Sequence, residues 1–151
     1  MVEIENGQKC WAFGSKKYVE AAVKNVLDHL KKVGEGLADK DVTLMTSGYH
    51  PNIDITPKLG PEDADYFHSI IGILRWIVEL GRIEINLEAL MLSSHLVIPQ
   101  EGQFQELLHV FAFIKKHMNT EMVFDLSEPD ININYFNRQD WSYLIYSLPS
   151  E

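Results

Sequence analysis

Cysteine and basic residues are scarce in this sequence, and long uninterrupted hydrophobic stretches are absent. Cys10 is the only cysteine among 151 residues, which excludes an internal disulfide and a zinc site built on cysteines. The 22 acidic residues outnumber the 13 basic ones and give a net charge of −9, so the chain lacks the basic surplus typical of a protein that binds nucleic acid on its own. No stretch reaches the roughly 20 uncharged apolar residues that span a bilayer, so we expect no membrane partner.

Motifs that signal catalysis are missing as well. The six histidines do not form the His-x-x-x-His or Glu-x-x-His spacing with which one helix offers two metal ligands. Two close acid pairs, Asp39 with Asp41 and Asp63 with Asp65, fall in a polar loop and in a first helical turn, which favours turn and cap roles over metal binding. There is no phosphate loop, dinucleotide-binding glycine motif or nucleophile elbow. We therefore predict no catalytic residue, no metal ligand and no cofactor in this chain.

The sequence does contain amphipathic segments, and these predict a mainly α fold. Apolar residues recur at helical spacing, which indicates a small bundle of about four helices with one or two short peripheral strands. The predicted helices cover residues 16–33, 61–80, 84–98 and 103–117, and residues 121–125 form a predicted strand. The predicted organisation is an N-terminal extension (1–14), a helical domain (15–125) and an acidic tail or linker (126–151), whose aromatic end is a candidate docking segment.

Local signals refine the first two predicted helices. Ser15 is the expected N-cap of the first helix and Gly34 its expected C-terminal stop. In the stretch SIIGILRWIVELGRIEI (69–85), Arg75, Glu79 and Arg82 fall on one polar stripe and need not be buried. Arg75 and Glu79 also have the spacing of an ion pair.

Further patterns concern burial and the pairing of charges. The helix over 84–98 has little polar surface, which predicts that it is the most buried. On the first helix, Glu20 precedes Lys24 and Asp28 precedes Lys32 by four residues, which predicts a locally neutralised, solvated face. Aromatic side chains can stack on bases, but beside aliphatic residues most of them are predicted to belong to the core. They are Trp11, Phe13, Tyr18, Trp76, Phe111 and Phe113.

Three spaced blocks in a fixed order carry a resemblance to a known family. The blocks are WAFGSKKYVEAAVKNV at 11–26, FHSIIGILRW at 67–76, and the series Leu92-Ser93, Pro99 and FAFIKK at 111–116. Between the first two, Thr56-Pro57 matches a Thr-Pro of the connection. Together they resemble the region that follows the palm in the reverse transcriptase of copia-type retrotransposon polyproteins.

The resemblance implies which residues matter. The residues at the family's signature positions are expected to be structural: Tyr18, Phe67, Gly72, Trp76, Arg82, Ile85 and Pro99. The weak candidates for nucleic-acid contact are Lys16, Lys17, Lys115 and Lys116. The chain departs from the family at Ile83-Glu84, where the family has Pro-Asp, and at Gln103, where it has His. The family's basic residues in the following helix fall on Leu108, His109 and Ala112 here, which weakens any inherited contact with nucleic acid.

The resemblance also implies a function. In the full enzyme this thumb and connection region would support the palm and guide the primer–template duplex. The chain lacks the Tyr-x-Asp-Asp motif of the palm and the ribonuclease H domain, so we expect a non-catalytic fragment or degenerate copy. A divalent metal such as Mg²⁺ would belong to the full polymerase.

Two alternatives stay open. The first is a small helical interaction module with no nucleic-acid role, in which exposed apolar surface leads to partner binding or self-association. The second is an enzyme with a metal site assembled from scattered His and Asp residues, for which the spacing gives no support. The first ten residues, MVEIENGQKC, lack the regions of a signal peptide, and we expect an intracellular location.

Overall fold

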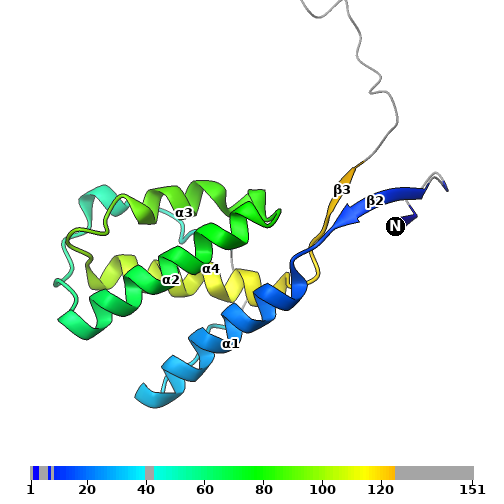
Figure 1. The fold of residues 1–151 in the computed structure, drawn as a ribbon. Helices are drawn as coiled ribbons and strands as arrows, with labels where there is room; N and C mark the ends of the chain where they lie inside the picture. The colour runs from blue at the N-terminus through cyan, green and yellow to red at the C-terminus, as the bar shows by residue number, and fades with distance from the viewer. Residues whose placement is uncertain (1, 4–6, 8, 40–42, 125–151) are drawn as a thin grey trace, which may run out of the picture.

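The computed structural model describes residues 2–3, 7, 9–39 and 43–124, which form a helical bundle with a small sheet at one end (Figure 1). The helices are α1 (Lys16–Val33), α2 (Pro61–Glu79), α3 (Asn86–Ser93) and α4 (Glu101–Lys116). The strands β1 (Val2–Glu3), β2 (Lys9–Phe13) and β3 (Met122–Phe124) pair antiparallel in the order β1-β2-β3. The predicted mainly α fold with short peripheral strands is confirmed.

Helix α1 has the predicted bounds, and both predicted cap residues occupy the expected positions. Gly34 adopts a left-handed conformation with φ of 77°, and its backbone N–H donates to the carbonyl of Lys31 while that of Glu35 donates to Leu30. Ser15 occupies the N-cap position, but its hydroxyl makes no capping hydrogen bond and is buried without a partner. Ser15 is therefore the N-cap residue as predicted, although its hydroxyl contributes no capping hydrogen bond.

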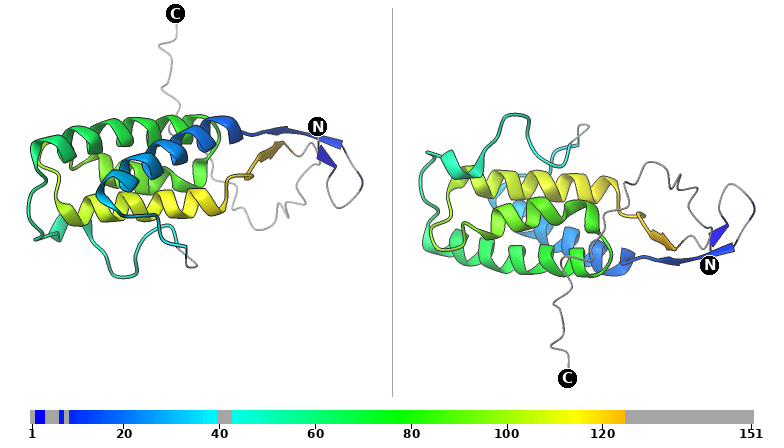
Figure 2. Two further views of the ribbon diagram at one scale, coloured as in Figure 1. Left: turned by 90° about the horizontal axis from the view of Figure 1, so that it is seen from below. Right: turned by 90° about the horizontal axis from the view of Figure 1, so that it is seen from above.

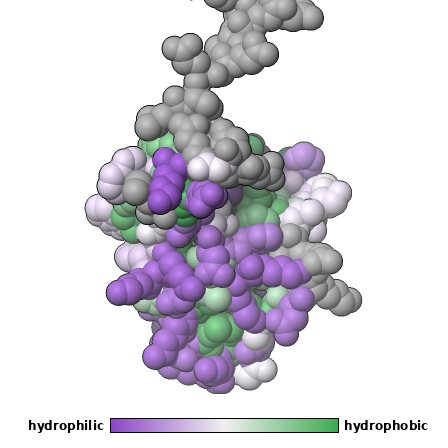
Figure 3. Space-filling model, turned by 90° about the vertical axis from the view of Figure 1, so that its right-hand side faces the viewer, coloured by the Kyte–Doolittle hydropathy of each residue, from purple (hydrophilic) through white to green (hydrophobic). Residues whose placement is uncertain are grey.

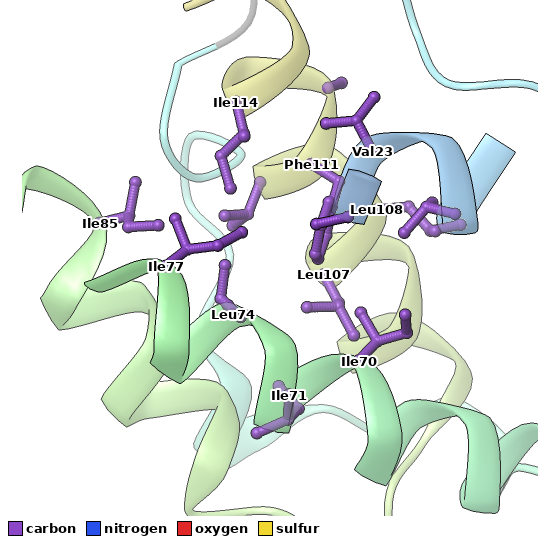
Figure 4. Close-up of a cluster of buried hydrophobic side chains, with 14 of the residues drawn as sticks. Val23, Ile70, Ile71, Leu74, Ile77, Ile85, Leu107, Leu108, Phe111 and Ile114 are labelled. Atoms are coloured by element: carbon purple, nitrogen blue, oxygen red, sulfur yellow. The ribbon is translucent and has the colours of Figure 1, made fainter. Parts of the chain in front are cut away.

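The core lies where α1, α2 and α4 face one another (Figure 4). Leu74 and Ile77 of α2 point toward Phe111 and Ile114 of α4, and Val23 comes from α1. All five side chains are buried, and removing such a side chain down to Ala costs about 2–5 kcal/mol in a typical core. Hydrophobic burial by these three helices is therefore the main source of stability in the bundle.

Helix α3 differs most from its prediction. It begins at Asn86 after a short 3-10 turn (Ile83–Ile85) and ends at Ser93, whereas the sequence predicted a helix over 84–98. The hydroxyl groups of Ser93 and Ser94 donate to the carbonyls of Ala89 and Met91, which offers the backbone an alternative to continuing the helix. The prediction that this helix is the most buried is wrong too, because its exposed apolar side chains include Leu87 and Leu90.

The connection between α1 and α2 is irregular, as predicted, but it is anchored to α4. A short 3-10 turn (Pro51–Ile53) lies within it, and Lys58 forms an antiparallel bridge with Gln100, the residue that precedes α4. The backbone N–H of Glu101 donates to the carbonyl of Pro57 at 2.9 Å, so the connection runs past the first turn of α4. Gln100 and Gln103 form a reciprocal capping box at that helix start.

The sheet projects beyond one end of the bundle (Figure 2). Strand β2 leads into α1, and α4 leads into β3, so the pairing of β2 with β3 ties the two helix ends together. Strand β2 lies within the segment predicted as an N-terminal extension. The predicted tail, 126–151, lies outside the described residues. Among the helices that the structure describes, none is long and apolar enough to cross a membrane.

Candidate functional site

The four candidate lysines lie at the end of the bundle that carries the sheet. Lys16 and Lys17 open α1, the element that follows β2, and Lys115 and Lys116 close α4, the element that precedes β3. Because Phe13 is paired with Met122, these helix ends lie at the same end of the molecule (Figure 1). Residues nearly a hundred positions apart in the sequence are thereby brought to one junction, which we call the lysine junction (16, 17, 115 and 116).

The positive charge of the lysine junction is partly offset. The ammonium nitrogen of Lys16 lies 3.9 Å from a carboxylate oxygen of Glu20, and that of Lys115 lies 2.9 Å from Asp39. The hydrogen bond and charge of Lys115 lower the pKa of the Asp39 carboxyl. Lys17 and Lys116 are exposed. The molecule seen from this side has a mostly hydrophilic surface with smaller apolar patches (Figure 3).

The ion pairs predicted along α1 are wrong in their partners. Glu20 approaches Lys16 rather than Lys24. Asp28 approaches Lys31 at 3.3 Å rather than Lys32. In both cases the acid pairs with a different lysine of the same helix than the one predicted. The face is exposed to solvent as predicted, but its ion pairs are Lys16–Glu20 and Asp28–Lys31.

An exposed aromatic face of the sheet adjoins the lysine junction. Trp11 is directly opposite Phe124, and Phe13 is directly opposite Met122, so these four side chains share one face. Trp11 is 65% exposed and Phe124 51% exposed, and the prediction that Trp11 and Phe13 belong to the core is wrong. Flat aromatic side chains beside lysines provide stacking and phosphate contact together, which is the chemistry of single-strand and duplex-end binding.

The seven family-signature residues separate into a buried and an exposed group. Phe67, Arg82, Ile85 and Pro99 are buried, which agrees with structural roles. Tyr18, Gly72 and Trp76 are exposed, and Trp76 has 62% of its surface accessible. A core role is therefore wrong for Tyr18 and Trp76, whereas Phe111 is fully buried and Phe113 half-buried.

Arg82 is 1% exposed, and its predicted place on a polar stripe is wrong. Helix α2 ends at Glu79, and Gly81, with φ of 100°, turns the chain back toward the bundle. A Cβ on Gly81 would approach the ring of Phe13 at 3.1 Å, so the turn packs closely on β2. The guanidinium Nε of Arg82 donates to Glu84, while both terminal nitrogens are buried without a partner.

A hydrogen-bond hub around Asp54 holds the α1–α2 connection against α4. Its carboxylate accepts hydrogen bonds from the Tyr49 hydroxyl at 2.7 Å, the Thr56 hydroxyl at 2.7 Å and the Thr56 backbone N–H at 2.9 Å. The Thr56 hydroxyl oxygen accepts in turn from the N–H of Gly102 at 2.8 Å. Burial tends to raise the pKa of Asp54, but these hydrogen bonds outweigh it and lower the pKa. Burial, followed by the bond to Asp54, raises the pKa of Tyr49.

A short pattern in the sequence indicates this hub, and the family resemblance covers only part of that pattern. The resemblance includes Thr56-Pro57 but not Asp54. An Asp two residues before a Thr is the pattern of a side chain that bonds to the backbone two residues onward, and Asp54 does so.

Histidine and acidic side chains do not assemble into a metal centre within the described ranges, where no group of three or more metal-binding side chains is found. His68 contacts the carbonyl of Leu96 at 2.6 Å. The Nε2 atoms of His95 and His109 are buried without partners.

Comparison of the chain with models of known protein families, with characterised proteins and with solved structures finds no match.

Proposed function

We propose that this chain is the region that follows the palm in a copia-type reverse transcriptase. In the polyprotein it supports the palm and helps to guide the primer–template duplex. On its own it does not polymerise DNA, because the acids that hold the catalytic Mg²⁺ belong to the palm. The observation that carries the proposal is the lysine junction beside the exposed aromatic face of β2 and β3.

The chemistry of this end suits a duplex better than a small ligand. Lysines contact phosphates without reading sequence, and exposed rings can stack on a terminal base pair or an unpaired template base. The two features lie at the same end although the chain as a whole is acidic. Contact is therefore expected at this end and not over the rest of the surface.

The salt dependence of the binding constant measures how many of the four lysines contact phosphates of the duplex. Four phosphate contacts give a slope of log K against log salt of about −3.6, or roughly a 150-fold loss of affinity for a fourfold rise in salt. Since Lys16 and Lys115 already have acidic neighbours, that slope is an upper limit. If only two of the four lysines engage, the slope falls to about −1.8 and the loss to roughly 12-fold.

The test is fluorescence anisotropy with a labelled primer–template duplex from low to physiological ionic strength. The variant Lys17→Gln/Lys116→Gln is expected to reduce the slope by about 1.8. Its matched control, Lys24→Gln/Lys32→Gln, removes the same charge from exposed positions elsewhere on α1 and should leave the slope unchanged. Absence of salt-sensitive binding at low ionic strength contradicts the nucleic-acid role.

A second candidate function is a helical interaction module, which one observation favours. Trp76 and the apolar side chains of Ile83, Leu87 and Leu90 are all more than half exposed on or after α2. Trp76 and Leu90 each line a hollow together with Arg75 and Glu79, and exposed apolar patches commonly mark an interaction site.

A further inference from the structure

The outer face of α2 has a surface hollow with an unusual lining. The hollow, about 280 Å³ in volume, is lined by Gly72, Arg75, Trp76 and Glu79. A Cβ on Gly72 would meet no atom within 4 Å, so neither packing nor the backbone requires glycine here. The glycine instead leaves room beside the exposed Trp76 for a side chain from outside. We call this surface the α2 face (72, 75, 76 and 79).

Both charges of the α2 face lack a partner in the described part of the chain. The expected ion pair between Arg75 and Glu79 is not formed, although the two residues are one helical turn apart. Both side chains are exposed and flank the tryptophan. A hydrophobic centre with one unpaired positive and one unpaired negative charge at its sides is the composition of an interface with a specific partner.

The apolar surface continues from the α2 face onto α3. A second, smaller hollow is lined by Val78, Asn86, Ala89 and Leu90 and shares Arg75 and Glu79 with the first. Leu90 is 57% exposed. The shallow groove between α2 and α3 therefore extends the hydrophobic area that a partner can cover.

We propose that the α2 face is an interface between two copies of this chain. In an antiparallel arrangement about a two-fold axis beside Trp76, the two tryptophans meet at the centre. Arg75 of each copy then faces Glu79 of the other, because the charges stand on either side of the axis. A two-fold interface must be complementary to itself, and a face with one charge of each sign meets that condition.

Charge complementarity favours this occupant over partners of a single charge sign or of none. An acidic partner such as nucleic acid would leave Glu79 repelled, and a basic partner would leave Arg75 repelled. A purely apolar partner would leave both charges unpaired and desolvated at the interface, which is costly. A second copy of the chain forms the Arg75–Glu79 pair twice, once on each side of the axis. This inference does not depend on the polymerase role, because it concerns a different surface from the lysine junction.

The experiment is sedimentation equilibrium of the full chain over a wide concentration range, with four variants. The wild type is expected to shift with concentration from its 17.4 kDa monomer toward twice that mass. Arg75→Glu and Glu79→Arg each place like charges opposite one another twice, and each should weaken dimerisation by about tenfold or more. The double variant Arg75→Glu/Glu79→Arg restores complementarity and should dimerise again. Lys24→Glu is the control for Arg75→Glu, since it makes the same change of charge on α1.

Mixing the two single variants gives the sharpest readout. Arg75→Glu has two acidic side chains on its α2 face and Glu79→Arg has two basic ones, so neither dimerises well alone, but the mixture is expected to form a heterodimer. All these positions are exposed, so the variants should fold, and circular dichroism checks this. A wild-type monomer at all concentrations overturns the proposal. Dimers that persist in both single variants, or a mixture that stays monomeric, overturn it as well.

Discussion

Removing the Asp54 carboxylate is expected to destabilise the fold measurably, because this group joins the α1–α2 connection to the start of α4. Asp54→Ala deletes an acceptor of three hydrogen bonds, from Tyr49 and twice from Thr56. At about 0.5–1.5 kcal/mol for each bond, and with a partly exposed hub, the expected loss in unfolding free energy is roughly 2–3 kcal/mol. Thr56 then loses the acceptor that orients its hydroxyl toward Gly102.

The effect should depend on pH with a definite sign. The folded-state pKa of Asp54 lies below its ordinary value of 3.8, so its ionised form stabilises the fold. This contribution is fully present above pH 3.8 and is lost as pH falls through the lowered folded-state pKa. The difference between wild type and Asp54→Ala should therefore be constant at neutral pH and shrink below about pH 4.

Urea denaturation followed by circular dichroism measures both quantities. The slope of unfolding free energy against urea concentration should be the same for both proteins, so that their midpoint concentrations can be compared directly. Asp65→Ala is the control, because Asp65 is an exposed acid outside the hub, and its change should stay within about 0.5 kcal/mol. A loss below about 0.5 kcal/mol for Asp54→Ala, or a difference that persists unchanged at pH ~3, would refute the reasoning.

Three further substitutions test local features by the same denaturation assay. Gly102→Ala places a Cβ against the Asp54 carboxylate, so it should disrupt the hub and cost about 1–3 kcal/mol; a neutral effect would show that the carboxylate moves aside freely. In Gly34→Ala the new methyl group has no neighbouring atom, but the alanine must adopt φ of 77°. The expected loss in unfolding free energy is about 1 kcal/mol, from backbone strain alone. Arg82→Met removes two buried, unpartnered nitrogens along with the bond to Glu84, and should raise stability by about 1–3 kcal/mol; a loss of similar size would mean that those nitrogens are satisfied.

The sequence predicted the long helices well because their signals are local. The apolar stripe of α1 ends at a glycine, and α2 begins at Pro61 followed by Glu62 and Asp63, so both ends are marked in the chain itself. The end of α3 was predicted poorly, since it depends on serine hydroxyls returning to backbone carbonyls. Periodicity does not reveal such a competition.

The burial of individual side chains and the pairing of strands at the candidate sites could not be predicted, since they depend on which helices and strands pack against one another. Trp11 and Trp76 sit beside aliphatic residues in the sequence, yet the sheet projects from the bundle and the outer face of α2 is uncovered. Continuing the helix period past Gly81 predicts a polar-stripe position for Arg82, whereas the left-handed glycine redirects the chain and buries the arginine. The lysine junction required the pairing of β2 with β3, which no local pattern specifies.

The coding sequence immediately upstream of this chain tests the central proposal most directly. If the chain is the region that follows the palm of a copia-type reverse transcriptase, genomic DNA preceding its first codon should encode a palm with paired aspartates, intact or decayed. Sequencing that DNA, and reading it in all frames to allow for decay, is the decisive measurement. An upstream sequence unrelated to a polymerase palm would contradict the account.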